Sequence, residues 1–456
     1  MSSSLPSNSA QHHALVERLN RGVSKYHRWT NLSPQPFGES LCLHRFRLGN
    51  GLEVRIVPDD SAPVLSYHTW YRVGSRHEQP GKTGLAHLFE HLMFNETRRL
   101  PYGQFDRMIE AAGGETNAST WTDFTQYHAE LPASELSLIV DLEAQRMSEL
   151  LLRKAQVTSE IEVVANERRY RVDDDVEGQA AELLYATAFR KHPYHHPTIG
   201  SMEDILNFTT ADCSAFYRAY YAPNNAVVVI VGDVELEHTL KLLQKHYGRI
   251  APGKLPPPPR VREPKQRNER VHVLHRPTPA AKLLLGYHAP AIGDEDFTVL
   301  TLISDLLFGG RGSRLFRELV REKELVSDLS GSVAPFCEPG LFELWFSLRV
   351  GVKPSAVRGR VDAAIKRLQR EAVSQEELSR TANRYELGFL QSLESAAGKA
   401  DQIGFHEAIL GDASLMFTRI ATYREITAAQ VMDVAQRYLN STSRTRIEIM
   451  PSGATA

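Results

Sequence analysis

The segment GLAHLFEHLMFNET, residues 84–97, carries two histidines with a glutamate between them. Its apolar residues recur at the spacing of an amphipathic helix, at Leu85, Leu88, Phe89, Leu92 and Met93. The polar residues His87, Glu90 and His91 fall on the other side, together with Phe94. The pattern therefore predicts a helix that buries one face in a core and presents its polar residues from the other.

The two histidines have the spacing of metal ligands on a helix. His87 and His91 are four residues apart, so their imidazoles lie about one turn from each other. Imidazoles at this spacing can bind one Zn²⁺. Glu90 completes the order HxxEH, in which a carboxylate beside the metal can take a proton from a bound water. The alternative is a solvated polar helix face that binds no metal.

A third protein ligand is expected from TSEIEVVANERRYRV, residues 158–172. Ser159 and Glu162 fit a capping box, with Thr158 as an alternative cap, so a helix is predicted to begin here. Glu160 and Glu167 are seven residues apart and share one face of that helix. One of them can reach the metal, and the other can orient a histidine or the base.

The remaining histidines are interpreted as structural. The run HPYHHP at 192–197 holds two prolines, which make it a rigid loop in which His195 and His196 diverge. His12 and His13 lie near the start of the chain and are expected to be inert. The three cysteines, Cys42, Cys213 and Cys337, are odd in number and far apart, so neither a disulfide framework nor a CxxC metal pair is expected.

Composition limits the class of protein. The chain has 456 residues, enough for two or more domains, and a formal net charge of −2 without a long Lys/Arg block. Nucleic acid is therefore not expected as a partner. No apolar run is long enough for a membrane span, and the N-terminus lacks the apolar core of a secretory signal. A cytoplasmic location is expected, or a periplasmic one if a signal was removed.

A proline-rich stretch, APGKLPPPPRVREP at 251–264, divides the chain. Four consecutive prolines exclude a helix or a central strand and predict an extended linker over 251–268. The prediction is a flexible segment at 1–35, a metal-bearing domain at 36–250 and a second domain at 269–456.

The two halves follow one plan, which indicates a weak internal duplication. Strand-like segments are expected at 52–56, 65–73 and 226–231 in the first half, and at 271–274, 282–287 and 446–450 in the second. Helices are expected at 85–94 and 297–307. Because strands and helices mix without strict alternation, the predicted class is α+β, with a mixed, mostly antiparallel sheet covered by helices in each domain.

The segment at 84–97 closely resembles the active-site helix of pitrilysin/insulinase-type zinc peptidases, the inverzincins. The resemblance extends to NGLEVRIVPD at 50–59, GGETNASTWTDFTQYHAELP at 113–132, NERR at 166–169, HPYHHPTIG at 192–200, YRAYYAPNNAVVVIVGD at 217–233 and GGRGSRLFRELVREK at 309–323. The size and two-part layout resemble the branch that contains mitochondrial processing peptidase and its bacterial relatives.

This resemblance implies a zinc-dependent endopeptidase that acts on peptides or unfolded segments. The roles it implies are zinc ligands at His87, His91 and Glu167, a general base at Glu90, a supporting glutamate at Glu160 and substrate-backbone contacts at Asn117 and Ala118. An exposed edge strand can accept an extended peptide in this way. From the residues alone, Asn117 would be a turn residue after Gly113 and Gly114.

One departure from the family pattern concerns the second half. Family members with a complete site supply an arginine there and, about seven residues on, a tyrosine. Arg321 is present, but Val326, Ser327 and Asp328 occupy the region of the tyrosine. The departure suggests the zinc subunit of a heterodimer whose homologous partner supplies the Arg/Tyr pair. A homodimer is less favoured, and a non-catalytic peptide-binding or scaffold subunit is the alternative.

Overall fold

The computed structural model describes residues 9–452. Its elements form two compact units, each assembled from separate parts of the chain. Unit 1 comprises residues up to 165 together with 198–259 and 391–416, and unit 2 comprises 166–197, 260–390 and the remainder from 417. Both units combine a sheet with helices, so the predicted α+β class is confirmed.

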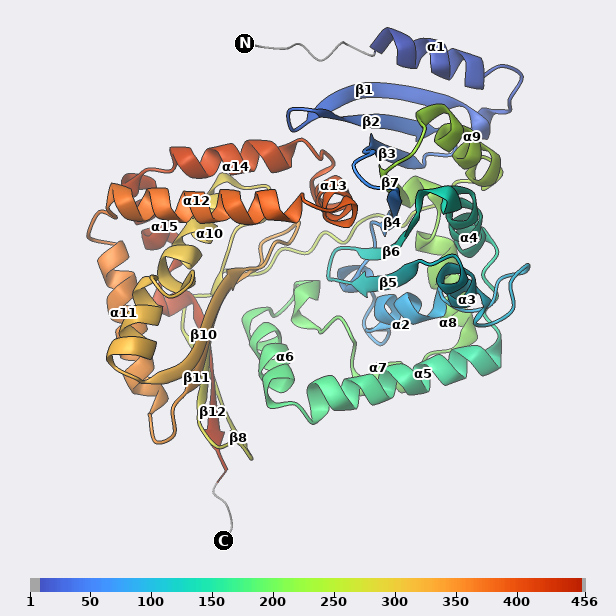
Figure 1. The fold of residues 1–456 in the computed structure, drawn as a ribbon. Coiled ribbons are helices and arrows are strands. Elements are labelled where there is room, and N and C mark those ends of the chain that lie inside the picture. Colours follow the sequence, from blue (N-terminus) through green and yellow to red (C-terminus); the bar gives the residue numbers. More distant parts are fainter. Residues whose placement is uncertain (1–8, 453–456) are drawn as a thin grey trace. The chain divides into compact units, whose positions relative to one another are not determined.

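The sheet of unit 1 has seven strands in the order β1-β2-β3-β7-β4-β6-β5 (Figure 1). All neighbours are antiparallel except β3 and β7. The strands are β1 (Trp29–Phe37), β2 (Leu41–Leu48), β3 (Glu53–Pro58), β4 (Val64–Tyr71), β5 (Glu115–Thr120), β6 (Thr125–Pro132) and β7 (Ala226–Gly232). The β2–β3 hairpin turns at Asn50 and Gly51, and Gly51 has a positive φ of 94°.

The sheet of unit 2 repeats five strands of the first. Its order, read from the parallel pair, is β8-β12-β9-β11-β10, which matches β3-β7-β4-β6-β5 in both sequence order and strand direction. The strands are β8 (Arg270–Arg276), β9 (Lys282–His288), β10 (Val326–Val333), β11 (Leu341–Leu348) and β12 (Arg444–Pro451). The internal duplication expected from the sequence is therefore visible in the strand order.

The helices cover these sheets. Unit 1 holds α1 (Ser9–Leu19), α2 (Leu85–Leu92), α3 (Gln104–Ala111), α4 (Leu136–Ser148), most of α5 (Lys154–Arg168), α7 (Met202–Leu206), α8 (Thr210–Tyr220), α9 (Leu236–Tyr247) and α13 (Ala396–Leu410). Unit 2 holds α6 (Val176–Ala188), α10 (Glu295–Phe308), η7 (Phe316–Glu322), α11 (Pro354–Leu368), most of α12 (Gln375–Ser392), most of α14 (Leu415–Glu425) and α15 (Ala428–Tyr438).

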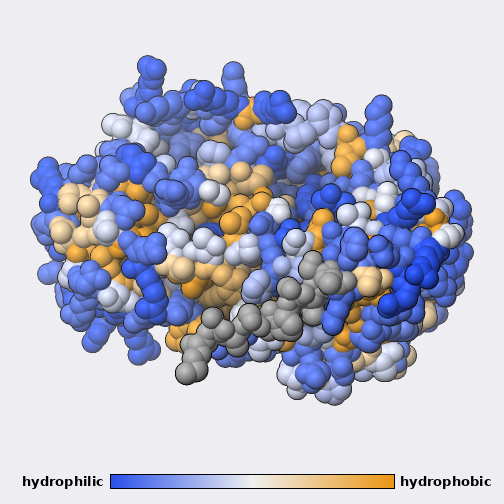
Figure 2. Space-filling model, turned by 90° about the horizontal axis from the view of Figure 1, so that it is seen from above, coloured by the Kyte–Doolittle hydropathy of each residue, from blue (hydrophilic) through white to orange (hydrophobic). Residues whose placement is uncertain are grey.

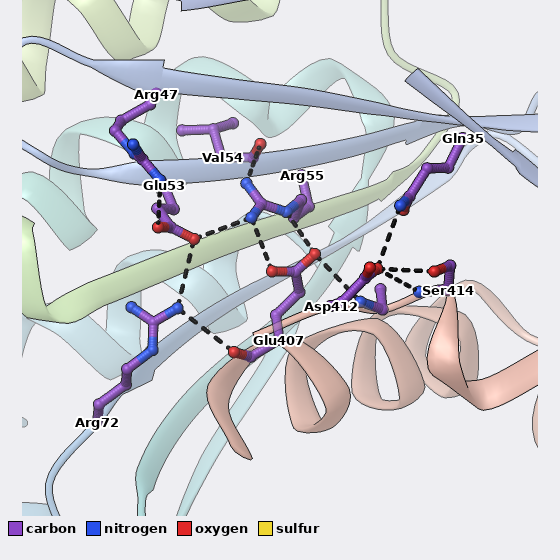
Figure 3. A network of polar contacts seen from close by, with 10 residues as sticks. Gln35, Arg47, Glu53, Val54, Arg55, Arg72, Glu407, Asp412 and Ser414 are labelled. Carbon is purple, nitrogen blue, oxygen red and sulfur yellow. Dashed lines mark hydrogen bonds and ion pairs between the residues drawn. The ribbon is translucent and has the colours of Figure 1, made fainter. Parts of the chain in front are cut away.

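Two helices are exchanged between the halves of the chain. α13 comes from the C-terminal half but packs on β4 and β7 of unit 1, while α6 comes from the N-terminal half and packs on β9 and β12 of unit 2. Figure 3 shows how α13 is attached: the Glu407 carboxylate bonds Arg55 of β3 through two short contacts. The compact units are therefore not the contiguous ranges 36–250 and 269–456.

Residues 9–35, expected to be flexible, form α1, the short helix η1 (Lys25–His27) and most of β1. The physical reason is an apolar stripe on α1: Leu15, Val16 and Leu19 are buried in the core of unit 1. The neighbouring residues are mostly polar, so the average composition of the segment suggests flexibility although α1 has a buried apolar face.

The predicted linker has neither helix nor strand between Tyr247 and Arg270, and the boundary between the units falls inside it, at Pro259 and Arg260. Hydrophilic residues dominate the face shown in Figure 2, and hydrophobic residues appear there in several patches. Over 9–452, none of the helices has the length and apolar character needed to cross a membrane.

Candidate metal centre

The helix α2 begins at a carboxylate clamp. Gly84 precedes it with φ of 94°, and its amide donates to Oε2 of Glu78 at 2.8 Å, while the amide of Ala86 donates to Oε1 at 2.7 Å. A Cβ at Gly84 would lie 2.3 Å from the carbonyl oxygen of Ile199, so only glycine fits. Through these two hydrogen bonds the Glu78 side chain fixes the first turn of the helix that carries both histidines.

The apolar face of α2 is buried as predicted. Leu88, Phe89 and Leu92 have no exposed surface, and Leu85 and Met93 are nearly as deeply buried. The Tyr127 hydroxyl of β6 donates to the carbonyl of Phe89 at 2.9 Å. Packing and this hydrogen bond hold the helix against the sheet, which fixes the direction of its polar face.

The helix α5 begins five residues before the expected cap. It starts at Lys154, so Thr158 and Ser159 lie inside it and cap nothing. Val157 is buried in the core of unit 1, and its amide donates to the carbonyl of Arg153, which extends the helix toward the N-terminus. The side chain of Arg153 in turn bonds Glu96 at 2.7 Å. Tertiary packing therefore overrides the capping signal.

Three side chains from α2 and α5 meet in the arrangement that a metal ion requires. One ligand atom from each of His87, His91 and Glu167 lies within 4.8 Å of the other two, the only such His/Cys/Asp/Glu cluster in 9–452. The two imidazole rings are 5.1 Å apart at 77°. His87 is buried, and the other two are partly buried. Two imidazoles and one carboxylate form a donor set of the kind found in catalytic zinc sites.

Glu160 is not part of this cluster but contacts one of its histidines. Its Oε2 is 3.7 Å from Nδ1 of His91, and its Oε1 accepts from the Asn95 amide at 3.2 Å. Glu167 also has a partner outside the cluster, because the Arg171 guanidinium contacts its Oε1 at 3.0 Å. The two glutamates that the sequence left interchangeable are thereby separated: Glu167 joins the cluster, and Glu160 faces His91.

Glu90 is partly buried on the same helix, between the two histidines in sequence. Burial raises the pKa of the Tyr221 phenol, and the nearby negative charge of Glu90 adds to that shift. The Glu90 carboxylate therefore lies close enough to the buried phenols of Tyr127 and Tyr221 to affect their ionisation.

The strand β5 is the outer edge of the seven-stranded sheet and contacts α2. Asn117 lies within the strand β5 and not in a turn. Its side chain is exposed, and that of Ala118 is half-buried. The Asn117 side chain accepts from the amide of Ala118 at 2.8 Å. An edge strand beside the metal-binding helix is a surface on which an extended peptide can form backbone hydrogen bonds.

In unit 2, Arg321 is exposed in the last turn of η7. Val326, Ser327 and Asp328 begin β10, the edge strand that corresponds to β5, and only Val326 among them is buried. No tyrosine occupies this part of the strand.

Three of the histidines interpreted as structural, His12, His192 and His195, have contacts within the protein. His192 bonds Glu338 through Nε2 at 2.6 Å, and Nδ1 of His195 lies 2.8 Å from the carbonyl of His192. His12 bonds His44 at 2.9 Å and is buried. Sequence reasoning missed Glu78, since no spacing rule connects it to α2. The glycine directly before the helix was the available signal for an unusual start.

Comparisons with known proteins agree with this geometry. Residues 56–202 match the family model described as "Insulinase (Peptidase family M16)", and 207–385 match "Peptidase M16 inactive domain". A Helicobacter pylori protein named "Zinc protease PqqE" is 32% identical over 408 residues, which cover 89% of this chain and 92% of that protein. The chain belongs to peptidase family M16, the insulinase family.

More distant relatives share the same extent. An "Uncharacterized zinc protease" of Mycobacterium tuberculosis is 27% identical over 410 residues, covering 90% of this chain and 93% of that one. The crystal structure of a protease from Helicobacter pylori superposes with a TM-score of 0.86 at 31% identity and covers 90% of this chain and 99% of that one. A Pseudomonas fluorescens structure titled as a peptidase M16 inactive domain, at 18% identity, shares the fold with a TM-score of 0.82 over 91% of this chain and 99% of that chain.

Proposed function

We propose that this protein is a zinc-dependent metalloendopeptidase that hydrolyses peptides or unfolded segments. The observation that carries the proposal is the cluster of His87, His91 and Glu167, whose ligand atoms lie within 4.8 Å of one another. The relatives' names, which call them zinc proteases, support the same reading.

The donor set fits zinc. His87, His91 and Glu167 would hold the ion, and three protein ligands leave a coordination position open for water or substrate, as a catalytic site requires. When bound, zinc would supply Lewis-acid polarisation of water and of the scissile carbonyl. Glu160 would act as a positioning residue, because its contact with Nδ1 of His91 fixes the orientation of that ring.

Glu90 would be the general base. Its position on α2, between the two candidate ligands in sequence, would bring it within reach of a water at the same centre. Its carboxylate oxygen would accept the proton of that water and return it to the nitrogen of the leaving amine, so that the carboxylate is regenerated. This mechanism needs no acyl-enzyme and therefore no nucleophilic cysteine. Burial raises the pKa of the Cys213 thiol to about 12, which leaves this thiol protonated and unreactive at neutral pH.

The substrate would bind as an added strand. Asn117 and Ala118 lie on the free edge of β5, and the internal bond from the Ala118 amide to Asn117 satisfies that donor until a peptide carbonyl replaces it. Because strand addition requires an extended backbone, unfolded segments would be preferred to folded proteins.

A second subunit would complete the enzyme. Arg321 is exposed without a tyrosine after it, which supports a heterodimer whose homologous partner supplies the Arg/Tyr pair, rather than a homodimer. A non-catalytic scaffold subunit is the competing function, favoured by the match of 207–385 to an inactive-domain model. The intact donor cluster favours catalysis.

The test combines metal analysis with peptide cleavage. The purified chain is expected to bind one zinc ion both alone and when mixed with a candidate homologous subunit. Cleavage of an unfolded peptide is expected only in the mixture, and a chelator should abolish it. Glu90→Gln should reduce the rate by about 10²–10⁴-fold and retain the zinc. Unchanged turnover in this variant would reject the base, and full activity of the single chain would reject the heterodimer. Zinc binding without cleavage in any mixture would favour the scaffold.

A further inference from the structure

Unit 2 contains an open cavity of about 930 Å³ that none of the metal-centre residues lines. One wall is the end of the proline-rich linker, residues 260–266, and another is the segment 288–291 after β9. Phe189 and Tyr438 add aromatic surface, and Pro339 also lines the cavity. The volume falls in the range of small-molecule sites, about 300–1,000 Å³.

The linker wall is held in place by its own side chains. The Glu263 carboxylate accepts hydrogen bonds from the amides of Arg190 and Lys191, both at 2.8 Å, and from the amide of His192 at 3.0 Å. Gln266 is buried, and its amide donates to the carbonyl of Arg444 at 2.8 Å. These bonds tie an otherwise irregular segment to unit 2, so the cavity exists before any ligand enters.

Most polar groups around the cavity already have partners within the chain. The carboxylate of Glu338 pairs with His192 at 2.6 Å. Asp294 caps α10 by accepting from the amide of Asp296 at 2.9 Å, and the Tyr438 hydroxyl donates to Asp296 at 2.9 Å. These groups already have hydrogen-bond or ion-pair partners within the chain, so they need no polar ligand inside the cavity to supply one.

The exceptions are Nε2 of His288, which is buried without a hydrogen-bond partner in the described part of the chain, and three cations. Arg260, Arg262 and Lys265 lie on the linker wall, and within 9–452 no hydrogen bond or ion pair engages their side chains. The only acidic residue among 260–266 is Glu263, which is already bound to three amides. Residues 260–266 thus carry three cations against one carboxylate, which leaves a net positive charge beside an apolar space.

We propose that this cavity binds a carboxylate attached to an apolar body, with the body inside and the carboxylate beside Arg260, Arg262 and Lys265. Burial of the apolar body supplies affinity, and the linker cations select a negative head group. A fatty acid and the free C-terminus of an apolar peptide both offer this chemistry. The proposal does not depend on zinc or on peptide hydrolysis.

The test titrates the full-length protein with dodecanoate and with dodecanol, and with acetyl-Ala-Leu-Phe as free acid and as amide, by calorimetry. Each acid is expected to bind about tenfold or more tightly than its neutral counterpart. Tighter binding of dodecanoate than of the peptide acid assigns the site to fatty acids, and the reverse order assigns it to peptide ends. Equal affinity for acids and neutral forms would overturn the proposal.

Two variants locate the binding. Ala291→Trp, which places a large side chain in the wall, should abolish binding, and the triple change of Arg260, Arg262 and Lys265 to Ala should weaken it about tenfold at unchanged stability. The matched control replaces three exposed cations of unit 2 that do not line the cavity, namely Arg311, Lys366 and Arg370. If the control triple weakens binding as much, or Ala291→Trp leaves it intact, the cavity is not the site.

Discussion

The Arg55 guanidinium and the Glu407 carboxylate form a bidentate pair across 352 residues of sequence. Nε and Nη2 of Arg55 lie 2.7 Å from Oε1 and Oε2 of Glu407, and both side chains are buried (Figure 3). Glu53 also contacts Nη2 at 2.8 Å, and Arg72 donates to the carbonyl of Glu407 at 3.3 Å. This network joins the exchanged helix α13 to the central strands of unit 1.

Breaking this pair should destabilise the protein strongly. Glu407→Ala leaves the buried guanidinium with Glu53 as its remaining carboxylate, and losing one member of a buried pair costs about 3–5 kcal/mol. Urea unfolding followed by circular dichroism measures the loss. In hydrogen exchange, protection of α13 should fall together with that of β3, because the network joins the two elements.

The control for this prediction is Arg47→Ala. Arg47 contacts Glu53 at 3.1 Å but is half exposed, so its removal should cost less than about 1 kcal/mol. The double variant Arg55→Met/Glu407→Leu, which removes both charges, should recover part of the stability. A Glu407→Ala effect as small as that of Arg47→Ala would show that the pair does not hold α13.

The strand pattern and the proximity of His87 to His91 could be predicted because both depend on local periodicity. The expected helix at 85–94 corresponds to α2 (Leu85–Leu92), and the expected strands at 226–231 and 446–450 correspond to β7 and β12. Residues 226–231 are an apolar run, 446–450 include alternating polar and apolar residues, and 85–94 repeat apolar residues at helical spacing. The i, i+4 histidine spacing needs only one helix to bring His87 and His91 together.

The exchange of α6 and α13 could not be predicted in this way. Both are ordinary helices, and no periodicity says which sheet a helix will cover. The pairing is decided by contacts between distant residues, such as Arg55 with Glu407, and by Gly404, where a Cβ would come within 1.9 Å of the Trp70 indole nitrogen. The start of α5 was missed for a similar reason, since burial of Val157 outweighs the capping signal at Ser159.

Glu160 should affect zinc affinity more than catalysis. If its contact with His91 orients the ring, Glu160→Gln should weaken zinc binding about 10–100-fold. Glu162→Gln is the matched control, because Glu162 lies on the same helix but is exposed. Competition with a chromophoric chelator measures both affinities. Equal zinc affinity of the two variants would mean that Glu160 does not support the site.

Glu78 should make stability depend on pH. Burial raises its pKa from 4.5 to about 8, although the amides of Ala86 and Gly84 favour the ionised form. The folded protein therefore binds more protons than the unfolded chain between about pH 4.5 and 8, and the contribution of this group to stability falls as pH rises through that window.

Glu78→Gln removes this titration. The unfolding free energy of the variant minus that of the parent should increase with pH from about 4.5 to 8, with a slope of up to about 1.4 kcal/mol per pH unit. Because all other groups titrate in both proteins, the difference isolates Glu78. A difference that stays constant across the window would show that the carboxyl is ionised in the folded protein throughout.

Gly84 should tolerate no side chain. Gly84→Ala places a Cβ 2.3 Å from the carbonyl oxygen of Ile199, so the backbone at the start of α2 must move, and the positive φ adds strain of about 1–2 kcal/mol. Gly81→Ala is the matched control, because Gly81 also has a positive φ, of 81°, but nothing lies within 4 Å of its Cβ position. The control should show only the strain. Since His87 is three residues after Gly84, Gly84→Ala should also weaken zinc binding, whereas Gly81→Ala should not; equal zinc affinity in the two variants would mean that the clamp at the start of α2 does not position the histidines.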